Sequence, residues 1–210
     1  MDSQKDSYSG EGLDEKTADA DPLKQFQRWF DEARAAGLPL PEAMTLATAT
    51  KDGRPSARLV LLKQADERGF VFYTNYGSPK AQELDANPQA ALVFYWPQLE
   101  RQVRVEGSVS RVTAAESDEY FQTRPRESQI GALASPQSEV ISGRDVLQQR
   151  SRELEEFYRD REIERPAYWG GYRLQPERIE FWKGRPGRLH DRLLYEPQAD
   201  GSWTIKRLAP

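Results

Sequence analysis

The chain has 210 residues, no cysteine and one histidine, and its formal net charge at pH 7 is −4. Without cysteine it forms no disulfide, no thiolate nucleophile and no cysteine metal site, and one histidine argues strongly against a histidine-rich zinc or di-iron centre. We therefore predict no metal site, and the negative net charge argues against nucleic acid as the main partner.

The first residues are polar and lack the apolar region of a signal peptide, and no apolar run is long enough to span a bilayer. We expect a soluble cytoplasmic protein that has no membrane partner. Residues 1–20 are rich in charged and small residues, so we expect an N-terminal arm that is disordered or ordered only on binding. The remainder, residues 21–210, is expected to form a single domain.

A helix is predicted directly after the arm. Asp21 and Pro22 are typical of an N-cap and a first helical position, and Gly37 ends the pattern. One apolar stripe follows the helical period and comprises Leu23, Phe26, Phe30 and Ala33.

From residue 43 the apolar pattern changes to the period of two that is typical of strands. Turn residues separate the segments at 51–54, 66–69 and 200–201. The predicted strands are 43–50, 55–64, 70–74, 90–96, 102–112, 168–174, 178–182, 189–195 and 203–208.

Three further helical segments interrupt the strands. A short helix is predicted over 78–84, and a capping box at 113–116 starts a helix that runs toward Pro125. Residues 126–142 are expected to be irregular. A strongly charged helix follows over 145–161, with buried positions at Val146, Leu147, Leu154 and Phe157.

Many antiparallel strands with a few inserted helices predict a mainly β protein with peripheral helices, in the α+β class, built on a β-barrel. The sequence shows no βαβ alternation and no glycine-rich nucleotide-binding motif.

The stretch 179–192 combines a strand with a charged return segment. Ile179 and Phe181 alternate with Glu180 and Trp182, a glycine- and proline-rich turn follows, and the chain returns through residues 188–192. At strand spacing, the return segment places three donors on one face, namely Arg188, His190 and Arg192. They predict an anion-binding surface around one titratable group. The alternative is a structural histidine between solvated arginines.

Cations also bracket other elements. Arg58 and Lys63 stand at the two ends of an apolar run, which suits either a strand beneath a planar ligand or a buried strand with solvated ends. Residues 77–80 open a helix with a serine and Lys80, which suits a phosphate site, although Ser78 and Pro79 also suit ordinary helix capping.

Tyr120, Arg124 and Ser128 are spaced four apart around Pro125. If these side chains converge at the end of a helix, one guanidinium and two hydroxyls would bind a phosphate. The alternative is a cation that only stabilises the helix C-terminus, and Pro125 is expected to break the helix. Gln102, Gln137 and Ser138 indicate nothing on their own.

Together these residues resemble the pyridoxine (pyridoxamine) 5′-phosphate oxidase family over about residues 21–210. The matching motifs agree in order and spacing: RLVLLK at 58–63, FYTN at 72–75, LERQVRVEG at 99–107, YFQTRPRESQIGA at 120–132, Gln137-Ser138, YWGGY at 168–172, IEFW and RLHDR within 179–192, and RLAP at 207–210.

The resemblance implies an FMN-binding split β-barrel that forms a homodimer with two FMN sites at the subunit interface. It implies FMN contacts from Arg58, Leu59, Val60, Leu61, Leu62, Lys63, Tyr73, Thr74, Lys80, Gln102, Gln137, Ser138, Trp182 and Arg192. It implies substrate contacts from Lys63, Tyr120, Arg124, Ser128, Arg188 and His190, of which Arg188 and His190 are the candidate catalytic residues.

Two departures from the family pattern stand out. The family usually has an arginine where this chain has Pro79, so one charge-assisted contact to the FMN phosphate is missing. Some members also carry an arginine-rich arm that ends in a tyrosine and closes over the substrate, and of that arm only Tyr8 matches here.

The resemblance implies FMN-dependent oxidation of pyridoxamine 5′-phosphate and pyridoxine 5′-phosphate to pyridoxal 5′-phosphate, with O₂ as acceptor and H₂O₂ as product. One alternative is a non-catalytic FMN-binding or pyridoxal-phosphate-binding protein. Another is a split-barrel flavin reductase, against which the set at 120, 124 and 128 argues.

Overall fold

The structure, a computed structural model, describes residues 12–210. In this part of the chain nine strands form one antiparallel sheet with the order β2-β1-β5-β6-β7-β4-β3, and β8 and β9 branch from β7. The strands are β1 (Ala43–Ala49), β2 (Pro55–Leu61), β3 (Gln64–Asp66), β4 (Gly69–Asn75), β5 (Gln89–Trp96), β6 (Arg101–Arg111), β7 (Trp169–Lys183), β8 (Asp191–Pro197) and β9 (Trp203–Arg207).

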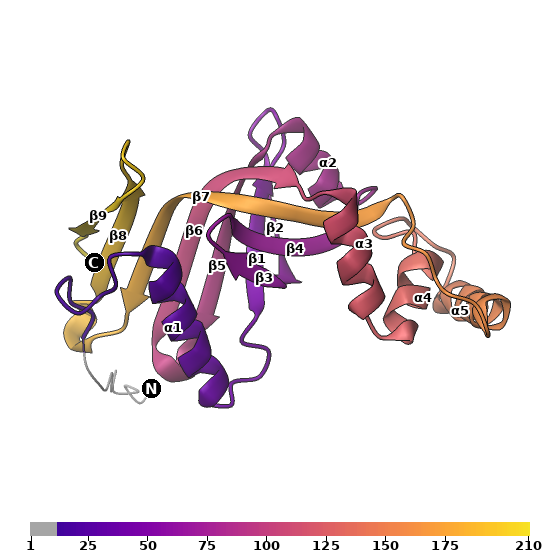
Figure 1. Ribbon diagram of the computed structural model, residues 1–210, viewed down its shortest axis with the longest axis horizontal. Coiled ribbons are helices and arrows are strands. Elements are labelled where there is room, and N and C mark those ends of the chain that lie inside the picture. The colour runs from indigo at the N-terminus through magenta and orange to yellow at the C-terminus, as the bar shows by residue number, and fades with distance from the viewer. Residues whose placement is uncertain (1–11) are drawn as a thin grey trace, which may run out of the picture.

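The long strand β7 organises the sheet. Along its first half it pairs with β4, from Trp169 to Leu174, and along its second half with β8, from Ile179 to Lys183. Its other edge pairs with β6 over its length. The sheet therefore forks at β7 and curls into the split half-barrel of Figure 1.

Five helices lie around this sheet in the described residues: α1 (Pro22–Ala35), α2 (Pro79–Ala86), α3 (Ala114–Thr123), α4 (Arg126–Ala134) and α5 (Arg144–Tyr158). Helix α1 covers the sheet, whereas α3, α4 and α5 extend from the end opposite β8 and β9 (Figure 1). None of the helices in residues 12–210 is both long and apolar enough to cross a membrane.

The predicted first helix and its apolar stripe are confirmed. The Asp21 side chain accepts a hydrogen bond from the Leu23 N–H at 2.9 Å, which caps α1. Phe26 is fully buried and meets the ring of Phe70 edge-on with centroids 4.9 Å apart. Burial of one such side chain contributes about 1.5–3 kcal/mol, so this face fixes α1 on the sheet.

A second, smaller core lies beneath α3 and α4. It contains Phe121, Ile130, Ile163 and Trp169. Because these residues bring α3, α4 and the start of β7 together, this core positions the segment around Arg124.

The outer face of the sheet is not covered by any helix of the described chain. Leu59 on β2 is 74% exposed and Tyr95 on β5 is 60% exposed. Strand register continues this face through Thr45, Val93 and Arg104 on adjacent strands. Apolar exposure of this kind on a sheet is typical of an interaction surface.

Residues 12–20 differ from the expected disorder. Leu13 is 5% exposed and its N–H donates to Asp191 at 3.0 Å. Tyr195 donates to the backbone oxygen of Asp19 at 2.8 Å. Leu13, the one large apolar residue of this polar stretch, therefore packs it against the domain beside β8. Residues 1–11, including Tyr8, lie outside the described residues.

The predicted strand at 55–64 is wrong at its end, because the chain changes partner there. The Leu62 N–H donates to Glu42 beside β1, whereas the Lys63 N–H donates to Val71 in β4. Leu62 is 6% exposed and belongs to the core. This crossover leaves Lys63 between two halves of the barrel.

Residues 126–142 were expected to be irregular, but α4 occupies the first nine of them. Pro125 does end α3, as predicted, but it also begins α4: the N–H groups of Ser128 and Gln129 both donate to its carbonyl. Proline lacks an N–H that a helix start does not need, so it suits this position.

Two predictions at the C-terminal side are also wrong. Segments 168–174 and 178–182 form the single strand β7, because a bulge at Glu177, opposite Glu106 and Gly107 of β6, absorbs the irregularity beside Pro176. The expected buried positions of α5 are not buried, and Phe157 is 57% exposed.

Candidate functional site

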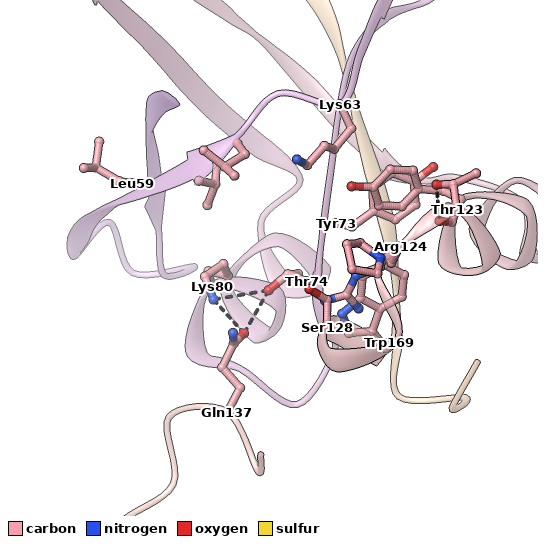
Figure 2. A pocket seen from close by; sticks show the side chains of 14 residues that line it. Leu59, Lys63, Tyr73, Thr74, Lys80, Thr123, Arg124, Ser128, Gln137 and Trp169 are labelled. Atoms are coloured by element: carbon pink, nitrogen blue, oxygen red, sulfur yellow. Dashed lines mark hydrogen bonds between the residues drawn. The ribbon is translucent and has the colours of Figure 1, made fainter. Parts of the chain in front are cut away.

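A cavity of about 480 Å³ opens between β2, β4 and the α3–α4 segment. Figure 2 shows Lys80, Thr74 and Gln137 gathered on one side of the cavity and Tyr73, Arg124 and Trp169 on the other, with Leu59 apart at its edge. Eleven residues proposed from the sequence line it: Leu59, Val60, Leu61, Lys63, Tyr73, Thr74, Lys80, Tyr120, Arg124, Ser128 and Gln137.

A polar triangle lies on one side of the cavity. The ammonium of Lys80 donates to Thr74 Oγ1 at 3.2 Å and to Gln137 Oε1 at 3.0 Å, and Thr74 donates to Gln137 at 3.0 Å (Figure 2). Burial lowers the pKa of Lys80, and the nearby charge of Arg58 lowers it further. A half-buried ammonium with neutral partners favours an anion as an additional partner.

Ser78 occupies the N-cap position of α2, as the capping alternative expected, but its side chain does not cap the helix. Its hydroxyl donates back to the carbonyl of Asn75 at 2.7 Å and makes no cap bond to α2. Pro79 does occupy the first helical turn. Ser78 instead fixes the turn that places Lys80 beside Thr74.

Aromatic rings form the other side of the cavity. Tyr73 and Tyr120 stack with centroids 4.0 Å apart, and Tyr73 also stacks on Trp169 at 5.3 Å. Burial raises the pKa of Tyr73 to about 12, so its hydroxyl remains protonated at neutral pH.

Arg124 lies between these two sides. Its guanidinium is 4.6 Å from the ring centroid of Trp169, and burial lowers its pKa. Its Nη1 atom is buried and has no hydrogen-bond partner among the described residues. A buried guanidinium nitrogen without a partner is costly, so this geometry favours an anionic ligand.

Tyr120, Arg124 and Ser128 converge without a continuous helix. Helix α3 ends at Thr123, Arg124 is extended, and α4 starts at Arg126. All three still line the cavity, because the break at Pro125 turns α4 back toward α3.

Arg58 and Leu62 do not line this cavity. Arg58 is paired with Glu83 of α2 at 3.4 Å and donates to the carbonyl of Leu46 at 3.3 Å. Glu83 also accepts hydrogen bonds from Thr48 and Ser56. Arg58 therefore links β2 to α2, the helix that carries Lys80. Ser138 follows Gln137 with φ of 73° and is not in the lining.

A second group of proposed residues gathers on the exposed outer face near β8. Gln102, Trp182 and Arg192 are register neighbours on β6, β7 and β8. The ring of His190 lies 4.7 Å from that of Trp182. Arg192 pairs with the buried Glu180 at 2.7 Å.

The prediction that Arg188, His190 and Arg192 share one strand face is wrong. Arg188 belongs to the short turn η2 (Pro186–Arg188) with φ of 61°, and β8 begins only at Asp191. The glycine and proline turn therefore extends further than the sequence pattern indicated. His190 Nδ1 accepts the backbone N–H of Arg185 at 3.1 Å, which leaves the proton of the neutral ring on Nε2.

A single chain does not bring the two groups together. Trp169 in the first group and Trp182 in the second lie on the same strand, 13 residues apart, or about 40 Å of strand path. Figure 1 shows β8 and α3 on opposite sides of the central strands. Within residues 12–210, no cluster of three or more acidic or histidine side chains could hold a metal ion.

Sequence reasoning did not predict three residues of the lining as contacts of FMN or substrate, namely Trp169, Thr123 and Pro125. The YWGGY motif carries the signal for Trp169. A Cβ on Gly171 would lie 2.8 Å from Tyr73 Cε1, and one on Gly170 would lie 2.1 Å from Tyr76 Oη. The two glycines let the tyrosine rings lie directly on β7 beside Trp169.

Two family models match the chain. Residues 30–158 match the model described as pyridoxamine 5′-phosphate oxidase. Residues 169–210 match that described as the pyridoxine 5′-phosphate oxidase C-terminal dimerisation region.

Curated relatives are similar over nearly the whole chain. The pyridoxine/pyridoxamine 5′-phosphate oxidase of Rubrobacter xylanophilus is 61% identical over 203 residues, 97% of this chain and 93% of that protein. The protein of the same name from Trichormus variabilis is 58% identical over 203 residues, 97% of this chain and 95% of that protein.

Among solved structures, PhzG from Burkholderia lata, in complex with tetrahydrophenazine-1-carboxylic acid, has a TM-score of 0.88 and 32% identity. The match covers 93% of this chain and 95% of that one. A pyridoxamine 5′-phosphate oxidase-related, FMN-binding protein from Nostoc punctiforme has a TM-score of 0.72 at 17% identity, covers 91% of this chain and all of its own, and supports the fold alone.

Proposed function

Because the chain belongs to the pyridoxamine 5′-phosphate oxidase family, we propose that it oxidises pyridoxamine 5′-phosphate and pyridoxine 5′-phosphate to pyridoxal 5′-phosphate with bound FMN. The amine consumes O₂ and water and yields the aldehyde, ammonia and H₂O₂, and the alcohol consumes O₂ and yields the aldehyde and H₂O₂. When bound, the flavin supplies the two-electron redox chemistry that no side chain of this protein provides.

The observation that carries the proposal is the buried, unpartnered guanidinium nitrogen of Arg124, a residue that lines the cavity. A substrate phosphate would give it an anionic acceptor, and charge-assisted bonds of this kind are among the strongest in proteins. Lys63, Tyr120 and Ser128 line the same cavity and supply an ammonium and two hydroxyls. Together they would hold the substrate at its phosphate end.

The residues of the opposite side fit FMN. Lys80, with Thr74 and Gln137, would hold the cofactor phosphate at the start of α2. The exposed side chains of Leu59 and Leu61 on β2 offer an apolar surface to a flat ring. Pro79 supplies no charge, so Lys80 is the nearest cation of α2 to that phosphate.

A second copy of the chain would complete the site. The outer face of the sheet is uncovered, and the C-terminal residues match a model described as a dimerisation region. In a two-fold dimer, Gln102, Trp182 and Arg192 of one copy would reach FMN held by the other. Arg188 and His190 would orient the polar groups of the pyridine ring, and no general base is assigned.

The direct test of the activity is product stoichiometry. With either substrate, the purified protein loaded with FMN should form pyridoxal 5′-phosphate and H₂O₂ in equal amounts, and ammonia only from the amine. Substrate binding without H₂O₂ would favour a non-catalytic binding protein. Consumption of a nicotinamide cofactor in place of the substrate would favour a flavin reductase.

Subunit mixing tests the shared site. The variants Arg124→Met and His190→Ala, each of which should have little oxidase activity by itself, are unfolded, mixed in equal amounts and refolded together. Random pairing makes half the dimers mixed, each with one intact site of two, so about a quarter of wild-type activity should return. If both residues serve a site within one chain, no activity will return, and refolded wild type serves as the control for yield.

A further inference from the structure

Four charged side chains form a closed ring between β3, β7 and α3, outside the lining of the main cavity. Arg173 on β7 lies 2.8 Å from Asp66 and 3.0 Å from Glu116. Arg68 lies 3.0 Å from Asp66 and 3.1 Å from Glu116. Each arginine therefore bridges both carboxylates.

The ring is most buried where it meets the sheet. The Arg173 side chain is 11% exposed and that of Asp66 is 17% exposed, whereas Arg68 is 55% exposed. Shielded ion pairs with several partners hold their geometry better than isolated surface pairs. Arg173 is therefore the member of the ring that the structure fixes most firmly.

The two carboxylate oxygens of Glu116 have different partners. Its Oε1 atom meets the two arginines, while Oε2 accepts hydrogen bonds from the N–H and the hydroxyl of Thr113, both at 2.9 Å. Hydrogen bonds from the Thr113 backbone and side chain lower the pKa of Glu116, and the charge of Arg173 lowers it further. One carboxylate thus caps α3 and attaches its first turn to β7.

Helix α3 carries the residues at the phosphate end of the cavity. Tyr120 lies one helical turn after Glu116, on the same face, and stacks on Tyr73. The hydroxyl of Tyr73 donates to the carbonyl of Glu116 at 3.4 Å. The helix ends at Thr123, so its placement also sets that of Arg124.

We propose that Arg173 and Glu116 are positioning residues that set the affinity for the phosphate end of the substrate. Neither lies in the cavity that holds Arg124, and they act by fixing α3 against β7. This inference rests on the proposed substrate. A ring that only stabilises the fold would change the melting temperature and leave substrate affinity unchanged.

The test compares Arg173→Met with a matched variant, Arg101→Met. Arg101 on β6 forms an ion pair with Glu32 of α1, and its side chain is 19% exposed. Both variants lose one shielded ion-paired guanidinium that joins a helix to the sheet, and both should melt at lower temperature. Of these two arginines, only Arg173 forms an ion pair with α3.

In Arg173→Met, the Kd for pyridoxal 5′-phosphate and the KM for pyridoxamine 5′-phosphate should rise about tenfold with kcat retained, a size typical of residues that act through others. Arg101→Met should keep both values. Arg173→Lys carries a single ammonium that reaches one carboxylate at a time, so its Kd and KM should lie between those of the wild type and of Arg173→Met. The double variant Arg173→Met/Glu116→Gln should have nearly the same Kd and KM as Arg173→Met, because both substitutions break the same ring of ion pairs.

Hydrogen exchange of residues 114–123 without ligand provides a readout independent of the proposed function. Exchange should accelerate in Arg173→Met and not in Arg101→Met. Equal Kd values for the two variants, or unchanged exchange in α3, would overturn the inference. If the wild-type protein itself neither binds nor oxidises the phosphate esters, the proposed function fails, and the exchange data still decide whether the ring holds α3.

Discussion

Replacement of Arg124 by methionine should weaken substrate binding while leaving the ligand-free protein as stable as before or more so. Most arginines that have hydrogen-bonding partners stabilise the fold, so their replacement lowers stability. Weaker ligand binding combined with unchanged or higher stability is therefore specific to a binding residue. Arg124 has a buried Nη1 atom that lacks a partner among the described residues, and its main favourable contact is with the ring of Trp169. Methionine retains most of the side-chain volume and removes the charge.

The magnitudes follow from these contacts. An unsatisfied buried donor costs about 1–3 kcal/mol, and the lost cation–π contact is worth about 0.5–2 kcal/mol. Taken at mid-range, the two effects leave a gain of about 0.75 kcal/mol in the free energy of unfolding of the variant, and each kcal/mol is about 2–4 °C for a chain of this size. Loss of charge-assisted bonds worth about 3 kcal/mol to a phosphate corresponds to roughly 150-fold weaker binding.

Calorimetric titration with pyridoxal 5′-phosphate gives the Kd, and thermal melts without ligand give the stability. The matched control is Arg126→Met. Arg126 donates to the backbone carbonyls of Tyr158 and Arg161 and does not line the cavity. The control should melt at lower temperature and keep the wild-type Kd. An Arg124→Met protein that melts several degrees lower and binds as tightly as wild type would refute this assignment of Arg124.

Three further predictions concern the cofactor side and the aromatic wall. Burial lowers the pKa of Lys80, so its charge, and with it FMN affinity, should decline as the pH rises through that lowered pKa, at lower pH than for an ordinary lysine. Fluorescence titrations up to pH about 10 should show this decline, and Lys80→Arg should abolish it. Pro79→Arg should add a charge-assisted contact and tighten FMN binding at least about tenfold in the same titration, and an unchanged Kd would place the phosphate elsewhere. Gly171→Ala would place a Cβ 2.8 Å from Tyr73, so melts should show a loss of about 1–3 kcal/mol and kinetics a higher KM. Wild-type behaviour would contradict the close contact.

Local patterns in the sequence predicted much of the fold, because the residues responsible act over short distances. The Asp21 cap, the stripe around Phe26 and the capping box at Glu116 are all present in the structure. The period-two segments formed strands for the same reason. Where the structure depended on a partner distant in sequence, the local pattern was insufficient: the crossover at Leu62 and the bulge at Glu177 are set by neighbouring strands.

The residues of the candidate site were likewise predictable from the sequence, whereas their arrangement in space depended on distant parts of the chain. Spacing alone left Tyr120, Arg124 and Ser128 open to two interpretations, and the turn at Pro125 brings all three to one cavity. Arg188 and His190 were assigned to a strand that begins only at Asp191, because a glycine with positive φ at Gly187 prolongs the turn. The separation of Trp182 from Trp169 could not be read from the sequence, since it depends on the full length of β7.

The most direct test of the proposed oxidase is a visible spectrum of the FMN-loaded protein before and after anaerobic addition of pyridoxamine 5′-phosphate. The proposal predicts a yellow flavin spectrum that bleaches on addition and returns when air is admitted. Bound flavin that stays oxidised in the presence of saturating substrate would contradict it.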